Sequence, residues 1–286
     1  MAKIEVNGIG NIEYEIIGTG KRHAIITPGG RFTKDAGGVR ELAQKVAEGG
    51  FRVVIWDRPN SGGSDACFEG PSESGMHADA MVGLLRALNM TPALVIGGSA
   101  GSRVSLLTAL RHPDVVERLF VFWISGGVVG VISLASYYYH DSWCAAAMGD
   151  MNAVCEVPMW KQMIARNPRV REILLRQDPK LFMAKMTEWA KLFIPREDAA
   201  LPADLPAAGL GALKMPVMIL RSGASDPHHP RETSERLHAS IPGSQFAEPP
   251  WGDDEWLKKM QAQARGEPLF AGWPKLAPQI LAFANG

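Results

Sequence analysis

The segment Gly97-Gly98-Ser99-Ala100-Gly101 has the residue types and spacing of a reactive serine. The apolar run 93–96 before it is typical of a buried strand, and apolar residues at helical spacing follow it through 110. A strand that turns sharply into a helix leaves no room for side chains at the glycines, and it strains the serine while exposing its hydroxyl. The segment therefore predicts a nucleophile elbow with Ser99 as the nucleophile.

A serine nucleophile needs an imidazole to accept its proton, and two histidines follow the apolar strand 217–220. Sites on parallel sheets lie where strands end, so the loop Asp226-Pro227-His228-His229-Pro230 is well placed. We expect His229 to be the base, with His228 as the alternative, because Pro230 restricts the backbone after His229. A competing interpretation makes both of them solvent-facing loop residues.

The acid that orients the imidazole has two candidates, and the sequence leaves the choice open. Asp226 precedes the histidines, and Asp253 lies in a later loop that is rich in carboxylates. Two other histidines could approach the site only with further assumptions: His77 near the start of a helix, and His140 in the middle of the chain. The two adjacent histidines do not predict a metal site, because carboxylates are expected near an acid loop anyway.

Strands and helices alternate along most of the chain, which predicts an α/β fold with a mostly parallel sheet. The first two strands are expected to form a hairpin or meander. The expected strands are 4–6, 12–17, 23–27, 52–56, 94–96, 119–123, 217–220 and 245–247. Helical spacing of apolar residues predicts helices near 39–46, 74–88, 102–110 and 231–240.

The alternation stops between residues 128 and 210, where helical segments rich in methionine and aromatic residues follow one another. We interpret 128–210 as a helical cap on a core made of 1–127 and 211–286. Such side chains line irregular apolar pockets, so Tyr138, Trp143 and Trp160 are expected to contact the substrate. The alternative is that they pack the cap against the core.

These motifs together resemble the α/β-hydrolase superfamily, in the capped branch that includes haloperoxidases, epoxide hydrolases and carbon–carbon hydrolases. The segments that carry the resemblance are Pro28-Gly29-Gly30-Arg31, the run from Asp57 to Ser64, the elbow at Ser99, His112-Pro113, and Gly223-Ala224-Ser225-Asp226. It implies an eight-stranded sheet with helices on both faces and an inserted helical cap. It also implies an acyl-enzyme mechanism without a cofactor, in which the amide of Ala100 and that of Gly30 or Arg31 bind the oxyanion.

The chain departs from this family at the histidine. Members usually carry the acid after the seventh strand and the histidine after the eighth. Here Trp251-Gly252-Asp253-Asp254-Glu255 occupies the later position, and no histidine follows His238. We therefore expect an exchanged arrangement in which the seventh-strand loop supplies the base.

The composition limits the classes of partner that we expect for this chain. The 286 residues carry 30 basic and 30 acidic side chains, which argues against nucleic acid or a membrane surface as a partner and favours a small-molecule substrate. Three cysteines without metal-ligand spacing, and an N-terminus that runs directly into a strand, favour the cytoplasm. A homodimer is compatible with the sequence but not indicated by it.

The function expected from these observations is hydrolysis of an ester, lactone or amide, or of a carbon–carbon bond, in a small hydrophobic or aromatic molecule. Arg31 and Arg103 flank the presumed site, and either could hold a substrate carboxylate. A ligand-binding receptor that has lost turnover is one alternative. A lyase or peroxidase that uses only the oxyanion site is another.

Overall fold

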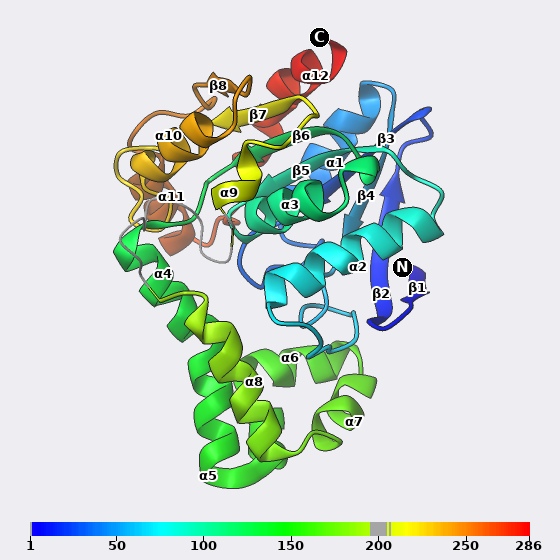
Figure 1. The fold of residues 1–286 in the computed structure, drawn as a ribbon, viewed down its shortest axis with the longest axis vertical. Helices are drawn as coiled ribbons and strands as arrows, with labels where there is room; N and C mark the ends of the chain where they lie inside the picture. Colours follow the sequence, from blue (N-terminus) through cyan, green and yellow to red (C-terminus); the bar gives the residue numbers. More distant parts are fainter. Residues whose placement is uncertain (1, 195–204, 206) are drawn as a thin grey trace.

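The computed structural model describes residues 2–194, 205 and 207–286, and its centre is an eight-stranded sheet (Figure 1). The strand order is β1-β2-β4-β3-β5-β6-β7-β8, with antiparallel pairs at β1-β2 and β2-β4 and parallel pairs elsewhere. The strands are β1 (Ala2–Val6), β2 (Gly10–Ile17), β3 (Arg22–Thr27), β4 (Phe51–Trp56), β5 (Ala93–Gly98), β6 (Val116–Phe122), β7 (Val217–Leu220) and β8 (Gln245–Ala247). The predicted α/β architecture is confirmed.

The central strands are apolar throughout because helices cover both faces of the sheet. One face packs α1 (Val39–Glu48) and α12 (Ala277–Asn285) against β3 to β6. The opposite face packs α2 (Glu73–Ala87), α3 (Ala100–Arg111) and α10 (Arg231–Ser240). Helix α11 (Glu255–Ala264) follows β8, and short 3₁₀ turns lie at Pro113–Val115 and Trp273–Leu276.

A separate group of helices lies between β6 and β7 and projects from the carboxyl edge of the sheet (Figure 1). Its members are α4 (Gly127–Ala135), the π-helix η2 (Ser136–His140), α5 (Asp141–Glu156), α6 (Pro158–Arg166), α7 (Arg169–Leu175) and α8 (Pro179–Lys191). These helices bury a hydrophobic cluster that includes Trp160 and Trp189, and Ala66, Cys67 and Met76 from the first part of the chain also belong to it.

The chain returns to the sheet through α9 (Ala207–Leu210). Residues 195–204 and 206, which fall within the interval 128–210 assigned to the cap, lie outside the described residues. Among the helices that the structure describes, none is long and apolar enough to cross a bilayer.

Candidate active site

Ser99 lies at the turn between β5 and α3, in a backbone conformation that side-chain-bearing residues rarely adopt. Its φ is 57° and its ψ is −121°. The neighbouring glycines are required by space, because a Cβ on Gly97 would lie 2.3 Å from Gly101 O, and one on Gly101 would lie 2.1 Å from Thr27 O. The backbone at this turn is therefore strained and closely packed, as in a nucleophile elbow.

His229 lies directly in front of this serine. Its Nε2 atom is 2.8 Å from Ser99 Oγ, and its Nδ1 atom is 2.7 Å from Asp226 Oδ2. The other oxygen of Asp226 accepts hydrogen bonds from the backbone N–H groups of His228 and His229, at 2.9 and 3.2 Å. The carboxylate thus closes a tight turn in the β7 loop and holds the imidazole from the same turn.

Burial sets the protonation states of this pair. The pKa of His229 is below its ordinary value because burial disfavours the imidazolium, although the Asp226 carboxylate acts in the opposite direction. Burial by itself would raise the pKa of Asp226, but the charge and hydrogen bond of His229 lower it to about 2. At neutral pH the acid is ionised and the imidazole is neutral, so its Nε2 can accept a proton from Ser99.

The structure does not bring the other proposed triad members to Ser99. Asp253 is about half exposed and pairs with Arg221 and Arg231. The prediction of Asp253 as the orienting acid is therefore wrong, and Asp226 is the acid that contacts the imidazole. The ring of His228 packs against Trp256, with ring centres 5.0 Å apart, while the neighbouring His229 faces the serine.

The two more distant histidines have other partners. His77 is buried with its Nε2 2.9 Å from Pro59 O, and burial lowers its pKa to about 3. His140 is exposed in η2 and contacts Cys144 Sγ. Neither histidine is within hydrogen-bonding distance of the serine hydroxyl.

The loop after β3 lies against the elbow. A Cβ on Gly29 would lie 2.7 Å from Ser99 Cβ, so only a glycine permits this approach. Arg58 donates hydrogen bonds to the carbonyl oxygens of Gly29 and Gly30, which turns the N–H groups of the same trans peptides the opposite way. Those N–H groups belong to Gly30 and Arg31.

The amide of Ala100 occupies the first position of α3, where backbone N–H groups have no partner inside the helix. Among the described residues no acceptor is hydrogen bonded to the amides of Gly30, Arg31 or Ala100. Gly30, Arg31 and Ala100 also line one small cavity together. This arrangement leaves donors available for an oxygen that becomes negative during a reaction.

The structure places the residues proposed to contact substrate in different environments. The guanidinium of Arg31 is buried against Glu73, with an Nη1–Oε1 distance of 2.6 Å, so it is not free to pair with a substrate carboxylate. Tyr138 lines the cavity beside the oxyanion donors. Trp160 is buried among the inserted helices, where it donates to Ser142 Oγ, and its ring lies 5.8 Å from that of Phe68 in the loop after β4, so it packs these helices against the rest of the chain. Trp143 lies half exposed on a separate groove. These two tryptophans do not line the cavity.

Two spaces lie between the cap helices and the sheet. The first is a small cavity of about 10 Å³, which is room for one water molecule. The second is an open groove of about 620 Å³ between the β3 loop and helices α5 and α6. Arg31, Ser61 and Tyr138 border both spaces, so they form the partition between the groove and the cavity.

Sequence reasoning missed a cluster that supports the imidazole. The ring of Trp123 stacks on His229, with centres 5.9 Å apart and planes at 21°. Its Nε1 donates to Glu255 Oε2 at 3.0 Å, and Lys259 Nζ lies 3.9 Å from the centre of the indole. Burial raises the pKa of Glu255 to about 7. Trp123 directly follows β6, the strand beside the elbow strand. This position is the sequence feature that could have indicated its place near the site.

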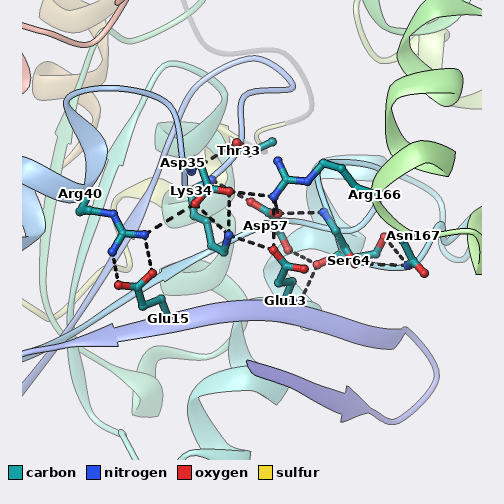
Figure 2. A network of polar contacts seen from close by, with 11 residues as sticks. Glu13, Glu15, Thr33, Lys34, Asp35, Arg40, Asp57, Ser64, Arg166 and Asn167 are labelled. Atoms are coloured by element: carbon teal, nitrogen blue, oxygen red, sulfur yellow. Dashed lines mark hydrogen bonds and ion pairs between the residues drawn. The ribbon is translucent and has the colours of Figure 1, made fainter. Parts of the chain in front are cut away.

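A second polar network joins helix α6 to the sheet (Figure 2). Arg166, at the end of α6, contacts Asp35 at 2.7 Å, Glu13 at 3.3 Å and Asp57 at 3.5 Å. Lys34 Nζ lies 2.9 Å from Glu13 and 2.8 Å from Asp35. The three carboxylates are close enough to share a cation, but these two basic side chains already pair with them.

Comparison with known proteins agrees with the observed fold. Residues 27–121 match the family model described as the alpha/beta hydrolase fold. The chain is similar over 84 residues, at 39% identity, to an sn-1-specific diacylglycerol lipase of Mus musculus. Over 122 residues it is 27% identical to a 2-hydroxy-6-oxononadienedioate/2-hydroxy-6-oxononatrienedioate hydrolase of Pseudomonas putida. These matches cover 28% and 42% of this chain, and only 25% and 42% of the respective relatives.

Solved structures match over the whole chain. An enol-lactonase from Burkholderia xenovorans LB400 aligns with a TM-score of 0.62 at 16% identity and covers all of both chains. A meta-cleavage product hydrolase, CumD, aligns with a TM-score of 0.61 at 17% identity, over 99% of this chain and 97% of that chain. The resemblance seen in the sequence is thereby confirmed at the level of the fold.

Proposed function

We propose that this chain, which has the α/β-hydrolase fold, is a serine hydrolase that cleaves an ester, lactone or amide through an acyl-enzyme. The observation that carries the proposal is the continuous hydrogen-bonded path from Ser99 Oγ through His229 to Asp226, with distances of 2.8 and 2.7 Å. Relatives and structural neighbours named lipase, carbamate hydrolase and lactonase support the hydrolytic class.

The proposed mechanism follows from this path. The neutral His229 removes the proton from Ser99 Oγ as that oxygen attacks the substrate carbonyl, and Asp226 stabilises the imidazolium that forms. The amides of Ala100 and of Gly30 or Arg31 stabilise the oxyanion. His229 then protonates the leaving group. In the second half of the reaction His229 removes a proton from water as the water attacks the acyl-enzyme, and it returns that proton to Ser99 Oγ as the acid product leaves. Cleavage of a carbon–carbon bond beside a carbonyl would use the same groups, because the hydrolases of 2-hydroxy-6-oxononadienedioate among its relatives share this fold.

Steady-state turnover of a panel of neutral benzyl and aryl esters tests this proposal. We expect measurable hydrolysis by the native protein and a loss of about 10³-fold or more in kcat for Ser99→Ala. Ser240→Ala is the matched control, because Ser240 ends α10 and its hydroxyl bonds only Arg236 O in the described part of the chain. Ligand binding without any turnover by the native protein would instead favour the receptor alternative.

A further inference from the structure

The small cavity beside the elbow is lined by polar groups whose hydrogen bonds are incomplete. The buried donors Arg103 Nε and Nη1, Tyr138 OH, Ser61 Oγ, Arg31 Nε and Arg58 Nε have no partner among the described residues. All of these side chains line the same cavity. An unsatisfied buried donor costs about 1–3 kcal/mol, so such a concentration in one place indicates a missing acceptor.

The charges around the cavity are also unbalanced. Three guanidinium groups line it, from Arg31, Arg58 and Arg103, and among the described residues the only carboxylate in the lining is that of Glu73. Arg31 and Asn60 hold Glu73 in the ionised form against the effect of burial, so the pKa of Glu73 is lowered to about 2. His77 is neutral because its pKa is about 3, and Arg58 remains charged because burial lowers its pKa only to about 10. The cavity therefore carries excess positive charge.

Arg103 is the guanidinium with the fewest partners of its own. Arg31 pairs with Glu73, and Arg58 donates to backbone carbonyls. Arg103 is 2% exposed, and the contacts of its guanidinium are the faces of Phe193 and Tyr138, with ring centres 4.6 and 5.9 Å away. A buried charge is costly unless an opposite charge joins it, which makes Arg103 the natural partner of an incoming anion.

The position of Arg103 fixes which part of a substrate it meets. It lies one turn along α3 from Ser99, and its backbone nitrogen is 3.4 Å from the carbonyl oxygen of Ser99. The leaving group must lie beside His229, which protonates it, but His229 does not line the cavity. The part of the substrate that enters the cavity is therefore the acyl portion.

We propose that Arg103, assisted by the Tyr138 hydroxyl, binds a carboxylate on the acyl portion of the substrate, so that the preferred substrates are half-esters or lactones of short dicarboxylic acids. The inference rests on the proposed function, and it adds the substrate class. The cavity of about 10 Å³ is smaller than a carboxylate group, so Tyr138 must shift for entry. Tyr138 lies in the π-helix η2, a type of irregularity that is frequent at functional sites.

A matched pair of substrates tests the proposal: benzyl hydrogen succinate, and benzyl 4-methylpentanoate, in which an isopropyl group replaces the carboxylate. Release of benzyl alcohol gives kcat/KM for each. We expect the native protein to prefer the succinate at least about 10-fold, and Arg103→Met to reduce this ratio about 10- to 100-fold, because a hydrogen bond to a charged group is worth about 1.5–3 kcal/mol. Tyr138→Phe, which removes only the hydroxyl, is expected to reduce the ratio about 3- to 10-fold.

Arg111→Met is the matched control, since it removes the same charge from the far end of α3, where Arg111 pairs with Asp79. It is expected to keep the native ratio. Native protein that hydrolyses both esters without a preference for the succinate overturns the proposal. A ratio unchanged in both Arg103→Met and Tyr138→Phe also overturns it. Stimulation of benzyl 4-methylpentanoate hydrolysis by free acetate also overturns the proposal, because the Arg103 site would then bind an anion that is not part of the substrate.

Binding separates this proposal from the proposed function. Calorimetric titration of Ser99→Ala with benzyl hydrogen succinate is expected to give saturable binding that Ser99→Ala/Arg103→Met weakens at least about 10-fold. If the native protein hydrolyses neither ester while this Arg103-dependent binding persists, the hydrolase proposal fails and the carboxylate site stands. If both esters are hydrolysed equally well and the double variant binds as the single one does, the hydrolase proposal stands and the carboxylate site fails.

Discussion

His229 and Asp226 are three residues apart in one turn, and the Nδ1 of the histidine lies 2.7 Å from the Oδ2 of the aspartate. The base and its orienting acid thus come from the single loop after β7. Two backbone N–H groups of the same turn bind the other carboxylate oxygen, so the turn itself fixes the acid that orients the imidazole. The segment after β8 supplies Glu255 and Lys259, which contact Trp123 behind the imidazole.

Removing the carboxylate charge tests this local pairing. Asp226→Asn is expected to lower kcat about 10³- to 10⁴-fold, because the amide favours the wrong imidazole tautomer and cannot stabilise the imidazolium. Asp253→Asn is the control, since the Asp253 side chain pairs with Arg221 and Arg231. Rates of ester hydrolysis that fall equally in the two variants would contradict the assignment of Asp226.

The pH dependence should follow the pKa of His229. Burial lowers this pKa below 6.5, and catalysis requires the neutral imidazole, so activity is lost as pH falls. The acid limb of kcat/KM is therefore expected to have its midpoint below pH 6.5. A midpoint above that value would contradict the buried, neutral imidazole of the structure.

Lys259 contributes to this shift. Its ammonium charge lowers the pKa of His229, so Lys259→Met should move the acid limb to higher pH. Lys258→Met is a matched control, because Lys258 is largely exposed and pairs with Asp254. The measurement is kcat/KM for a neutral ester across the acid range, and a limb that moves down, or moves equally in both variants, would disagree with the electrostatic role.

The network in Figure 2 predicts a stability effect. Arg166→Leu leaves the buried Asp57 and Glu13 with one basic partner fewer, so the free energy of unfolding should fall by about 1–3 kcal/mol. Arg176→Leu removes an exposed pair with Glu172 and should change it by no more than about 0.5 kcal/mol. Urea denaturation compares the two. Equal losses of unfolding free energy in the two variants would mean that the contacts of Arg166 with the sheet do not stabilise the fold.

The sequence predicted the fold and the elbow because both depend on local patterns. Apolar runs and helical spacing define the strands and helices, and the glycines at 97 and 101 report the close packing around Ser99. The proximity of the β7 loop to that serine followed from the rule that parallel strands end at one edge. These features need no knowledge of which side chains meet across the molecule.

The remaining features depend on long-range pairing, which no local pattern encodes. Asp253 and Asp226 look equivalent in the sequence, and only the fold brings Arg221 and Arg231 to Asp253. The aromatic residues of the inserted helices are equally ambiguous, since Trp160 packs against Phe68 of the loop after β4, whereas Tyr138 lines the cavity. Trp123 was recognised as the end of a strand, but its stacking on His229 was not.

The central claim is that Ser99 Oγ becomes the reactive oxygen because His229 lies against it, and covalent labelling tests this most directly. The native protein is treated with a fluorophosphonate, and intact mass and peptide mapping locate the adduct. We predict one stoichiometric adduct on Ser99, with no labelling of Ser99→Ala and labelling slowed at least about 100-fold in His229→Ala. An unlabelled native protein, or one labelled equally fast without His229, would contradict the account.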